Sequence, residues 1–441
     1  MDSIELLGDL LAKARAAGAD AADAVLVAGT ALSLQRRLGQ TEHLDRSETR
    51  ELGLRVFVGA RSAAVAATST DRAGFTTLAA RAVAMARVVP EDPFGGLAEE
   101  AAPVDVDLDL ADSDEPSAES LIARAATAED AALAVPGVTN SEGASAGYAR
   151  TEVVLVTTAG FAGTYVRTDH SISATALAGQ GTAMQRDYDY HNAVHRADLE
   201  DAARIGHTAG EKAVARLDPQ RPKTAKLPVV YDPRVSASLL GHLVGAINGA
   251  AVVRGTTFLK DRMGARIFAP GVDVIDDPRR RRGLASRPFD GEGVPTSELV
   301  LVNDGVLAAW LLDARSARQL GLRSNGHAVR GTSGPPTPAS TNLYLRPGPL
   351  SPAELMADIR EGLYVTELMG MGVNGLTGDY SRGAAGFMIR NGAIAEPVAE
   401  ITIAGTLQEM FAHLIPANDL RFRRGANAPT IRVEGMTMAG A

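Results

Sequence analysis

The sequence predicts an α+β fold, with an N-terminal sheet-and-helix part and a β-rich C-terminal part built around a buried helix. Three observations indicate it. Residues 1–217 alternate helical and strand-like stretches, residues 227–441 hold mostly short apolar runs ended by tight-turn signals, and residues 229–253 join a strand to an almost uncharged helix. With 441 residues, of which 45% are hydrophobic, the chain can bury two large cores.

The N-terminal part is expected to open with an amphipathic helix that leads into a sheet. Helices are predicted at 1–20, 70–88, 117–133 and 197–216, and strands at 24–35, 52–58, 63–68, 137–148, 151–158 and 161–184. The strands at 52–58 and 63–68 form a predicted hairpin.

Three polar stretches interrupt the apolar patterns of the chain. Residues 218–226 contain two prolines and four charges, so we expect a linker there that divides domain 1–217 from domain 227–441. The acidic stretch 89–116 is interpreted as a solvated surface loop, with a cation-binding loop as the alternative. The basic run Arg279–Arg282 is predicted to be an exposed loop, and its alternative is a contact with an acidic partner.

The C-terminal part is expected to be rich in short strands. Strands are predicted at 272–275, 299–302, 306–312, 341–345, 384–389 and 399–404, and helices at 313–320, 351–361 and 406–414. Asn303-Asp304-Gly305 and Asn391-Gly392 mark tight turns.

The central helix is predicted from Arg234 to Val253, with Asp232 as its N-cap and Pro233 in its first turn. One stripe differs from its apolar surroundings and contains Ser238, His242, Gly245 and Gly249. Two readings remain open. Either another backbone packs closely against this stripe, or it forms a cleft wall with His242 as the polar group.

Several long segments in a fixed order carry a family resemblance. They read RGTTFLKDRMG (254–264), RPFDGEG (287–293), RGTSGPP (330–336), TNLYL (341–345), GMGVNGLTGDYSRGAAGF (370–387) and PANDLRFR (416–423). With these segments the chain resembles the TldD/PmbA family, and within it the TldE (PmbA) branch.

The resemblance implies a metal-free subunit of a zinc metallopeptidase. A TldD-type partner carries a His-Glu-x-x-x-His helix and a cysteine, and alignment on RGTTF puts that motif at Leu240, Gly241 and Gly245 here. None of these side chains can bind zinc or act as a general base, and the chain has no cysteine. We therefore expect no metal or catalytic residue in this chain, and zinc in the partner.

The glycine-rich loop is the second feature that the family explains. Gly370–Gly375 fits GxGxxG by count, but the following residues continue the loop instead of opening a helix, so a dinucleotide site is disfavoured. The resemblance implies a loop beside a peptide channel. The candidate peptide contacts are His242, Gly375, Gly378, Asp379, Tyr380 and Arg382.

Two further patterns are weak. His191-x-x-x-His195 has the histidine spacing of a zinc helix, but Asn192 replaces the general base, so a surface turn is preferred to a metal site. Ser333 and Ser381 lie among glycines without a nucleophile elbow or an identifiable His and Asp pair.

Composition narrows the function. A net charge of −9 gives no reason to expect nucleic-acid binding, and any link to DNA gyrase would act through protein contacts. The N-terminus lacks a signal-peptide pattern and no stretch suits a membrane span, so a cytoplasmic protein is expected. The preferred hypothesis is a non-catalytic, peptide-binding subunit of a heterodimer. The alternative is a peptide-binding or regulatory homodimer that needs no partner.

Overall fold

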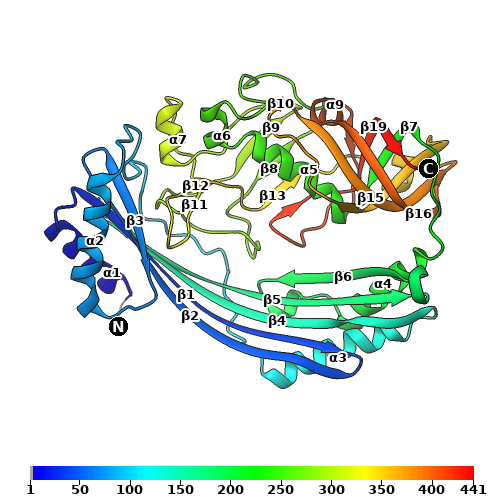
Figure 1. Cartoon of the computed structure of the whole chain (residues 1–441), viewed down its shortest axis with the longest axis horizontal. Helices are drawn as coiled ribbons and strands as arrows, with labels where there is room; N and C mark the ends of the chain where they lie inside the picture. Colours follow the sequence, from blue (N-terminus) through cyan, green and yellow to red (C-terminus); the bar gives the residue numbers. More distant parts are fainter. Residues whose placement is uncertain (1–2) are drawn as a thin grey trace.

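The computed structural model describes residues 3–441, and these form the expected α+β fold (Figure 1). The first sheet is antiparallel and has six strands in the order β3-β2-β1-β4-β5-β6. The strands are β1 (Ala21–Arg37), β2 (Gln40–Val58), β3 (Arg61–Ala67), β4 (Val138–Thr157), β5 (Ala162–Ala178) and β6 (Gln185–Ala193).

Helices cover one face of this sheet, and the second half of the chain covers the other (Figure 1). The helices are α1 (Ser3–Ala16), α2 (Phe75–Val88), α3 (Ala118–Leu133) and α4 (Ala202–Ala215). Successive side chains of a strand point to opposite faces. Leu26 of β1 therefore packs under α1 and α2, and Leu34 packs under α3 and α4, whereas Val25 contacts Phe289 of the second half.

The sheet departs from the sequence prediction in three places. Residues 40–51 extend β2 although they are exposed and polar, because β1 supplies an antiparallel partner along their whole length. The strands predicted at 137–148 and 151–158 are one strand, β4. The surface turn predicted around His191–His195 is wrong for 191–193, which belong to the edge strand β6 paired with β5.

The acidic connector 89–116 does not behave as a solvated loop throughout. Leu108 and Leu110 are buried, and Asp109 accepts a 2.6 Å hydrogen bond from Arg282. Asp107 likewise pairs with Arg281 at 3.0 Å. The acidic partner of the basic run is therefore this chain's own connector, which ties the two halves together.

The second half contains a closed sheet and a smaller open one. Its elements include β7 (Ala225–Tyr231), β8 (Val274–Asp276), β9 (Leu299–Asn303), β10 (Val306–Leu307), β13 (Leu343–Leu345), β14 (Glu361–Met369), β15 (Asp379–Arg390), β16 (Ala393–Thr406), β17 (Leu414–Pro416), β18 (Ala426–Asn427) and β19 (Ile431–Ala439). The order β16-β15-β14-β7-β19-β17 closes into a barrel because β16 also pairs with β19. The open sheet has the order β10-β9-β8-β13-β18.

Short elements fill the remaining connections. They are α6 (Gly249–Arg254), β11 (Ala328–Val329), β12 (Thr337–Pro338), α7 (Ala314–Gln319), α8 (Pro352–Met356) and α9 (Leu407–Ala412). Because β7 begins at Ala225, the predicted linker 218–226 overlaps the first strand of the second half. That the two domains are separable units stays a prediction.

The central helix is buried as expected but is shorter than predicted. It is α5 (Pro233–Ala246), which packs against both sheets through Leu239, Leu240 and Leu243. The continuous helix to residue 253 is wrong. At Asn248 the chain pairs with Leu311, and the Asn248 side chain caps α6 by accepting from the Ala250 N–H.

A buried ion cluster joins the first sheet to the second half. Asp23 of β1 accepts from Arg55 of β2 at 2.9 Å and also pairs with Arg330, and all three side chains are buried. Burial would raise the pKa of Asp23, but the two guanidinium groups outweigh it and hold that pKa below its usual value.

Glu292 belongs to the same cluster and is less well compensated. Its carboxylate lies 3.6 Å from Arg55 and accepts from the Ala314 N–H at 2.7 Å. Burial, partly opposed by Arg55, raises the pKa of Glu292 to about 7. Near neutral pH this carboxyl is therefore only partly ionised.

A glycine lets the two halves meet closely. A Cβ on Gly53 of β2 would collide with the carbonyl of Thr332, whose hydroxyl donates to Glu51 at 2.9 Å. Only a residue without a side chain allows this approach.

We expect Gly53→Ala to lower the free energy of unfolding by about 1–3 kcal/mol, because the new methyl group overpacks the interface. Chemical denaturation measures the change. The control is Gly8→Ala on the exposed face of α1, where nothing lies within 4 Å and where the variant should gain about 0.5–1 kcal/mol. Equal effects at both positions would contradict the close approach.

Glu292→Gln should remove a pH dependence of stability. The folded pKa of Glu292 lies above its ordinary value of 4.5, so its contribution is complete below about pH 4.5 and is lost as pH rises through about 7. The shift corresponds to about 3 kcal/mol. Wild type should therefore lose stability over this range relative to Glu292→Gln, whereas the exposed control Glu211→Gln should follow wild type. Parallel curves for wild type and Glu292→Gln would rule the effect out.

Candidate functional site

Three cavities lie in series along the edge strand β6, where it faces the second half. The first, of about 310 Å³, touches Arg186–Tyr188, the second, of about 330 Å³, touches Asp189 and Tyr190, and the third, of about 280 Å³, touches His191–Val194. Arg234 lines the first and second, and Arg424 lines the second and third. We call this continuous concavity the β6 groove.

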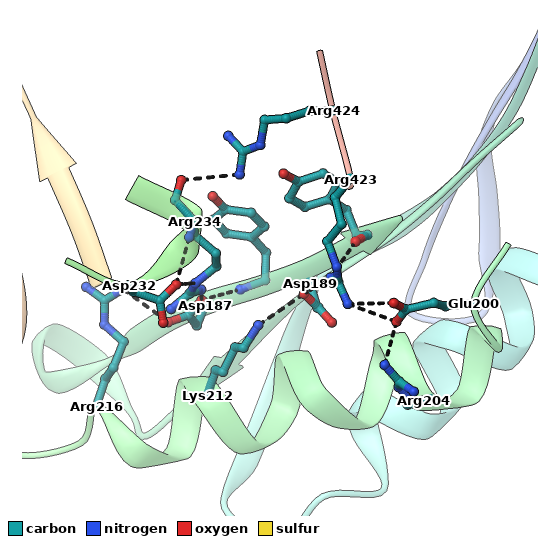
Figure 2. Close-up of polar contacts among 12 residues, drawn as sticks. Asp187, Asp189, Glu200, Arg204, Lys212, Arg216, Asp232, Arg234, Arg423 and Arg424 are labelled. Atoms are coloured by element: carbon teal, nitrogen blue, oxygen red, sulfur yellow. Dashed lines mark hydrogen bonds and ion pairs between the residues drawn. The ribbon is translucent and has the colours of Figure 1, made fainter. Parts of the chain in front are cut away.

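The alternation of β6 places two aspartates side by side in the groove. Asp187 and Asp189 are buried while Tyr188, between them, is exposed, as the two-residue period of a strand requires. Asp187 pairs with Arg234 at 2.5 Å, and Asp189 pairs with Lys212 at 3.0 Å (Figure 2). β6 thus presents buried acids to cations from both halves.

Arg423, the last residue of the PANDLRFR segment, lines the middle cavity of the groove. It pairs with Asp189 at 3.3 Å and with Glu200 at 2.7 Å, and Glu200 also binds Arg204 (Figure 2). Its guanidinium donates to the Tyr190 carbonyl at 3.1 Å. The edge of β6 is therefore covered in part by an arginine side chain.

Two tyrosines and two arginines form the opposite wall. Tyr188 and Tyr190 stack with ring centroids 6.1 Å apart. Arg234 lies 5.7 Å from the centroid of Tyr188, and Arg424 lies 5.5 Å from that of Tyr190. Such planar, half-apolar surfaces suit peptide side chains as well as backbone.

The N-terminus of α5 fixes Arg234 in position. Asp232 accepts from the Arg234 N–H at 2.9 Å and from the Tyr364 hydroxyl at 2.9 Å. Burial alone would lower the pKa of Arg234. The carboxylates of Asp232 and Asp187 outweigh that effect and raise the pKa, so the guanidinium remains charged. The same sequence features that begin the helix therefore also place a cation in the groove.

The groove carries more basic than acidic side chains. Twelve arginine or lysine residues line the three cavities, against six aspartate or glutamate residues. Many of these cations are paired with acids of the protein itself, as Arg234, Arg216 and Arg423 are. This excess of basic over acidic side chains favours a ligand that carries acidic groups.

The outer face of α5 is open. Leu240 is buried in the core, whereas Gly241 and Gly245 are exposed and a Cβ at either position would meet nothing within 4 Å. Close packing of a backbone against the stripe is therefore wrong for Gly245. Gly249 lies beyond the helix break, where a Cβ would meet the Leu311 carbonyl at 2.8 Å, so there the close approach is real.

A zinc ion does not fit this helix face. Leu240 offers only buried carbon atoms, and the two glycines offer no side chain. Among residues 3–441, no three His, Cys, Asp or Glu side chains group in a way that could hold a metal ion.

The structure brings together three of the predicted peptide contacts. His242 lies against Tyr380 with ring centroids 5.9 Å apart, and burial together with Arg382 lowers the pKa of His242. Arg382 reaches the 310 Å³ cavity, which Ser238 also lines. Tyr380 itself is buried.

The other three contacts lie in the glycine-rich loop and at its junction with β15, and two of them already have neighbours there. Asp379 accepts from the Thr377 hydroxyl at 2.6 Å, and Gly378 has a positive φ of 84° with Gln408 beside it. Gly375 has nothing within 4 Å of an added Cβ. Of the three, Gly375 is the one with open space beside it.

His191 and His195 do not share a helix. His191 lies in β6 and its Nδ1 accepts from the Glu200 N–H at 3.3 Å, whereas His195 pairs with Asp109 of the connector at 3.1 Å. The spacing that imitates a zinc helix therefore carries no zinc-helix geometry.

Sequence reasoning missed the acids and tyrosines of β6. The alternating run RDYDY at 186–190 is the signal that could have revealed them, since alternation is typical of a strand. It missed the role of Arg234, Arg423 and Arg424 as well, because charge pairs between distant segments leave no local pattern.

Comparisons with known proteins match most of the chain. Family models match residues 22–86 (PmbA/TldA metallopeptidase domain 1), 111–217 (central domain) and 224–440 (C-terminal domain). The chain is 36% identical over 425 residues to "Metalloprotease PmbA" of Escherichia coli O157:H7, covering 96% of this chain and 92% of that protein. It is 32% identical to the "Metalloprotease PmbA homolog" of Haemophilus influenzae, covering 96% and 93%.

Solved structures share the fold. A proposed modulator of DNA gyrase from Bacteroides thetaiotaomicron superposes with a TM-score of 0.90 at 25% identity, covering 99% of this chain and 98% of that one. TldE from Thermococcus kodakarensis has a TM-score of 0.89 at 19% identity, covering 99% and 100%. Among residues 3–441, no helix is long and apolar enough to cross a membrane. With all three family models in order along it, this chain belongs to the PmbA/TldA metallopeptidase family.

Proposed function

We propose that this chain is a non-catalytic subunit of a two-chain zinc metallopeptidase, in which it holds extended peptides while a TldD-type partner supplies zinc and the general base. The observation that carries the proposal is the open face of α5. Of the three positions aligned with the zinc motif, Leu240 is buried in the core and Gly241 and Gly245 are bare and open, so this helix presents no ligand where a peptidase needs three.

The β6 groove supports the binding part of the proposal. An extended peptide can lie along an edge strand and use its free backbone groups, while pockets receive alternate side chains. β6 has nine residues, a length of about 30 Å, and cavities line it throughout. The basic surplus favours peptides that carry acidic side chains.

The glycine-rich loop supports the partner part. Met371 is 87% exposed and Leu376 is 58% exposed, on a loop whose Gly375 carbonyl is anchored to the Phe258 N–H. Large apolar side chains that protrude this far suit contact with a second chain or with peptide.

The isolated chain is expected to bind no stoichiometric zinc and to cleave no unfolded protein. Zinc-catalysed peptide hydrolysis needs both a metal-bound water and a carboxylate base. Metal analysis and casein degradation measure the two properties. A mixture with the TldD-type chain of the same genome should cleave casein.

Two results would contradict this role. One is chelator-sensitive cleavage by the isolated chain. The other is cleavage by the mixture after the partner's catalytic Glu is replaced by Gln. A mixture that never forms a complex in sedimentation, while this chain alone sediments as a dimer that binds peptide, would favour the homodimer instead.

Gly375→Trp is expected to reduce cleavage by the mixture several-fold without changing the melting temperature, since it adds bulk where the fold leaves open space. The control is Gly74→Trp beside α2, also in open space but at the far end of the first sheet (Figure 1). His242→Ala should have only a modest effect. Gly378 is a poorer test, because a side chain at φ 84° strains the loop itself. Equal activity of the two Trp variants would exclude the loop from the peptide path.

A further inference from the structure

A separate cavity of about 90 Å³ lies between the first sheet and the second half, away from the β6 groove. Its apolar wall comes from both halves and consists of Val25, Val27, Val153, Leu155, Tyr165 and Phe289. Its polar wall consists of Arg287 and Arg330, with Asp290 beside them. Val329, 40% exposed, is a further lining residue and lies at the surface.

Both arginines bring buried donors without acceptors to this cavity. The Nε and Nη2 atoms of Arg287, and the same two atoms of Arg330, are buried and make no hydrogen bond. The Arg330 side chain is only 1% exposed and uses Nη1 alone, to pair with Asp23. Buried N–H groups left unpaired cost free energy, and those of a charged group cost most.

The neighbouring acids do not meet this need. Asp23 is shared by Arg55 and Arg330, and Glu292 accepts from the Ala314 N–H. Asp290 accepts from the N–H groups of Glu292, Val294 and Ala328.

The charge balance is also incomplete. Three arginines (55, 287 and 330) face three acids (23, 290 and 292). Burial raises the pKa of Asp290, and it raises the pKa of Glu292 to about 7, so Glu292 is only partly ionised near neutral pH. A ligand carboxylate would supply the negative charge that the cluster lacks when Glu292 is protonated.

From this arrangement we propose that the cavity is a binding site for the carboxylate of a small apolar acid, with Arg287 and Arg330 holding the carboxylate and the valine-rich wall holding the hydrocarbon. Guanidinium groups bind carboxylates through paired N–H donors. The cavity is several times larger than one water needs, and its wall is mostly apolar, so water alone would leave much of it poorly filled.

Two sources share this chemistry. One is the C-terminal residue of a peptide with a short apolar side chain, and the other is a free acid such as a branched short-chain carboxylate. The site does not depend on the proposed subunit role, because it rests on residues far from α5 and needs neither partner nor metal.

The test uses the full chain and 3-methylbutanoate as the probe, followed by ligand-observed NMR and calorimetry. The uncharged isostere 3-methylbutanamide should bind about ten-fold or more weakly, since it lacks the charge that the two guanidinium groups require. Sulfate tests a general anion site. If sulfate binds as tightly as 3-methylbutanoate and displaces it, the assignment is overturned.

Arg287→Met is the informative variant. Methionine keeps the apolar stem and removes two buried donors that make no hydrogen bond, while Asp290 keeps its three backbone N–H donors, so the melting temperature should hold or rise. Binding of 3-methylbutanoate should weaken about ten-fold or more. The matched control is Arg279→Met, which removes the same charge from an exposed position outside the cavity and should bind like wild type.

A second variant blocks the space instead of the charge. Val27→Phe keeps both arginines and fills the space beside the apolar wall, so it should abolish binding of 3-methylbutanoate. Peptides that end in valine with a free carboxylate, compared with the same peptides ending in an amide, distinguish the two sources. The proposal fails if 3-methylbutanoate shows no saturable binding, or if Arg287→Met binds it as wild type does.

Discussion

The relation between the two halves depends on the buried pairing of Asp23 with Arg55 and Arg330. Asp23 and Arg55 lie on neighbouring strands of the first sheet, and Arg330 comes from the RGTSGPP segment more than 300 residues later in the chain. A buried ion pair adds little net stability, but removing one member leaves an uncompensated charge that costs several kcal/mol. The cluster therefore specifies how the halves meet more than how strongly they hold. Two further contacts help to fix how the two halves are oriented. Gly53 allows β2 to approach Thr332 closely, and the connector's aspartates pair with Arg281 and Arg282.

The β6 groove follows from that orientation. The first sheet is covered by helices on one face, so its other face and its β6 edge are turned toward the second half (Figure 1). Arg234 then reaches Asp187 only because α5 begins opposite the edge, and Arg423 reaches Asp189 from the far end of the chain (Figure 2). The groove is assembled from β6, the start of α5 and the segment that contains Arg423. Its geometry therefore depends on the interface between the two halves.

Local patterns were enough to predict much of this fold and little of its site. Asp232-Pro233 predicts the start of α5 correctly because capping is decided within three residues. The end of α5 could not be read, since Asn248 leaves the helix to pair with Leu311, sixty-three residues away. The motif alignment and the open glycines concern one helix and were accessible, whereas the arginines that meet β6 are placed by tertiary contacts that no periodicity records.

The polar stretch 41–51 of β2 has one more consequence. β3 pairs only with residues 52–58, so along 41–51 the sheet ends in an edge with β1 on one side alone. The unpaired backbone N–H and C=O groups of an exposed edge of this length can pair with an edge strand of another copy of the chain. Here every side chain from Gln40 to Glu51 is exposed and six of them are charged, which hinders such pairing. The chain thus protects one edge of its long sheet with solvated charge and the other with its own arginines, and this difference decides which edge can be offered to a ligand without also promoting aggregation.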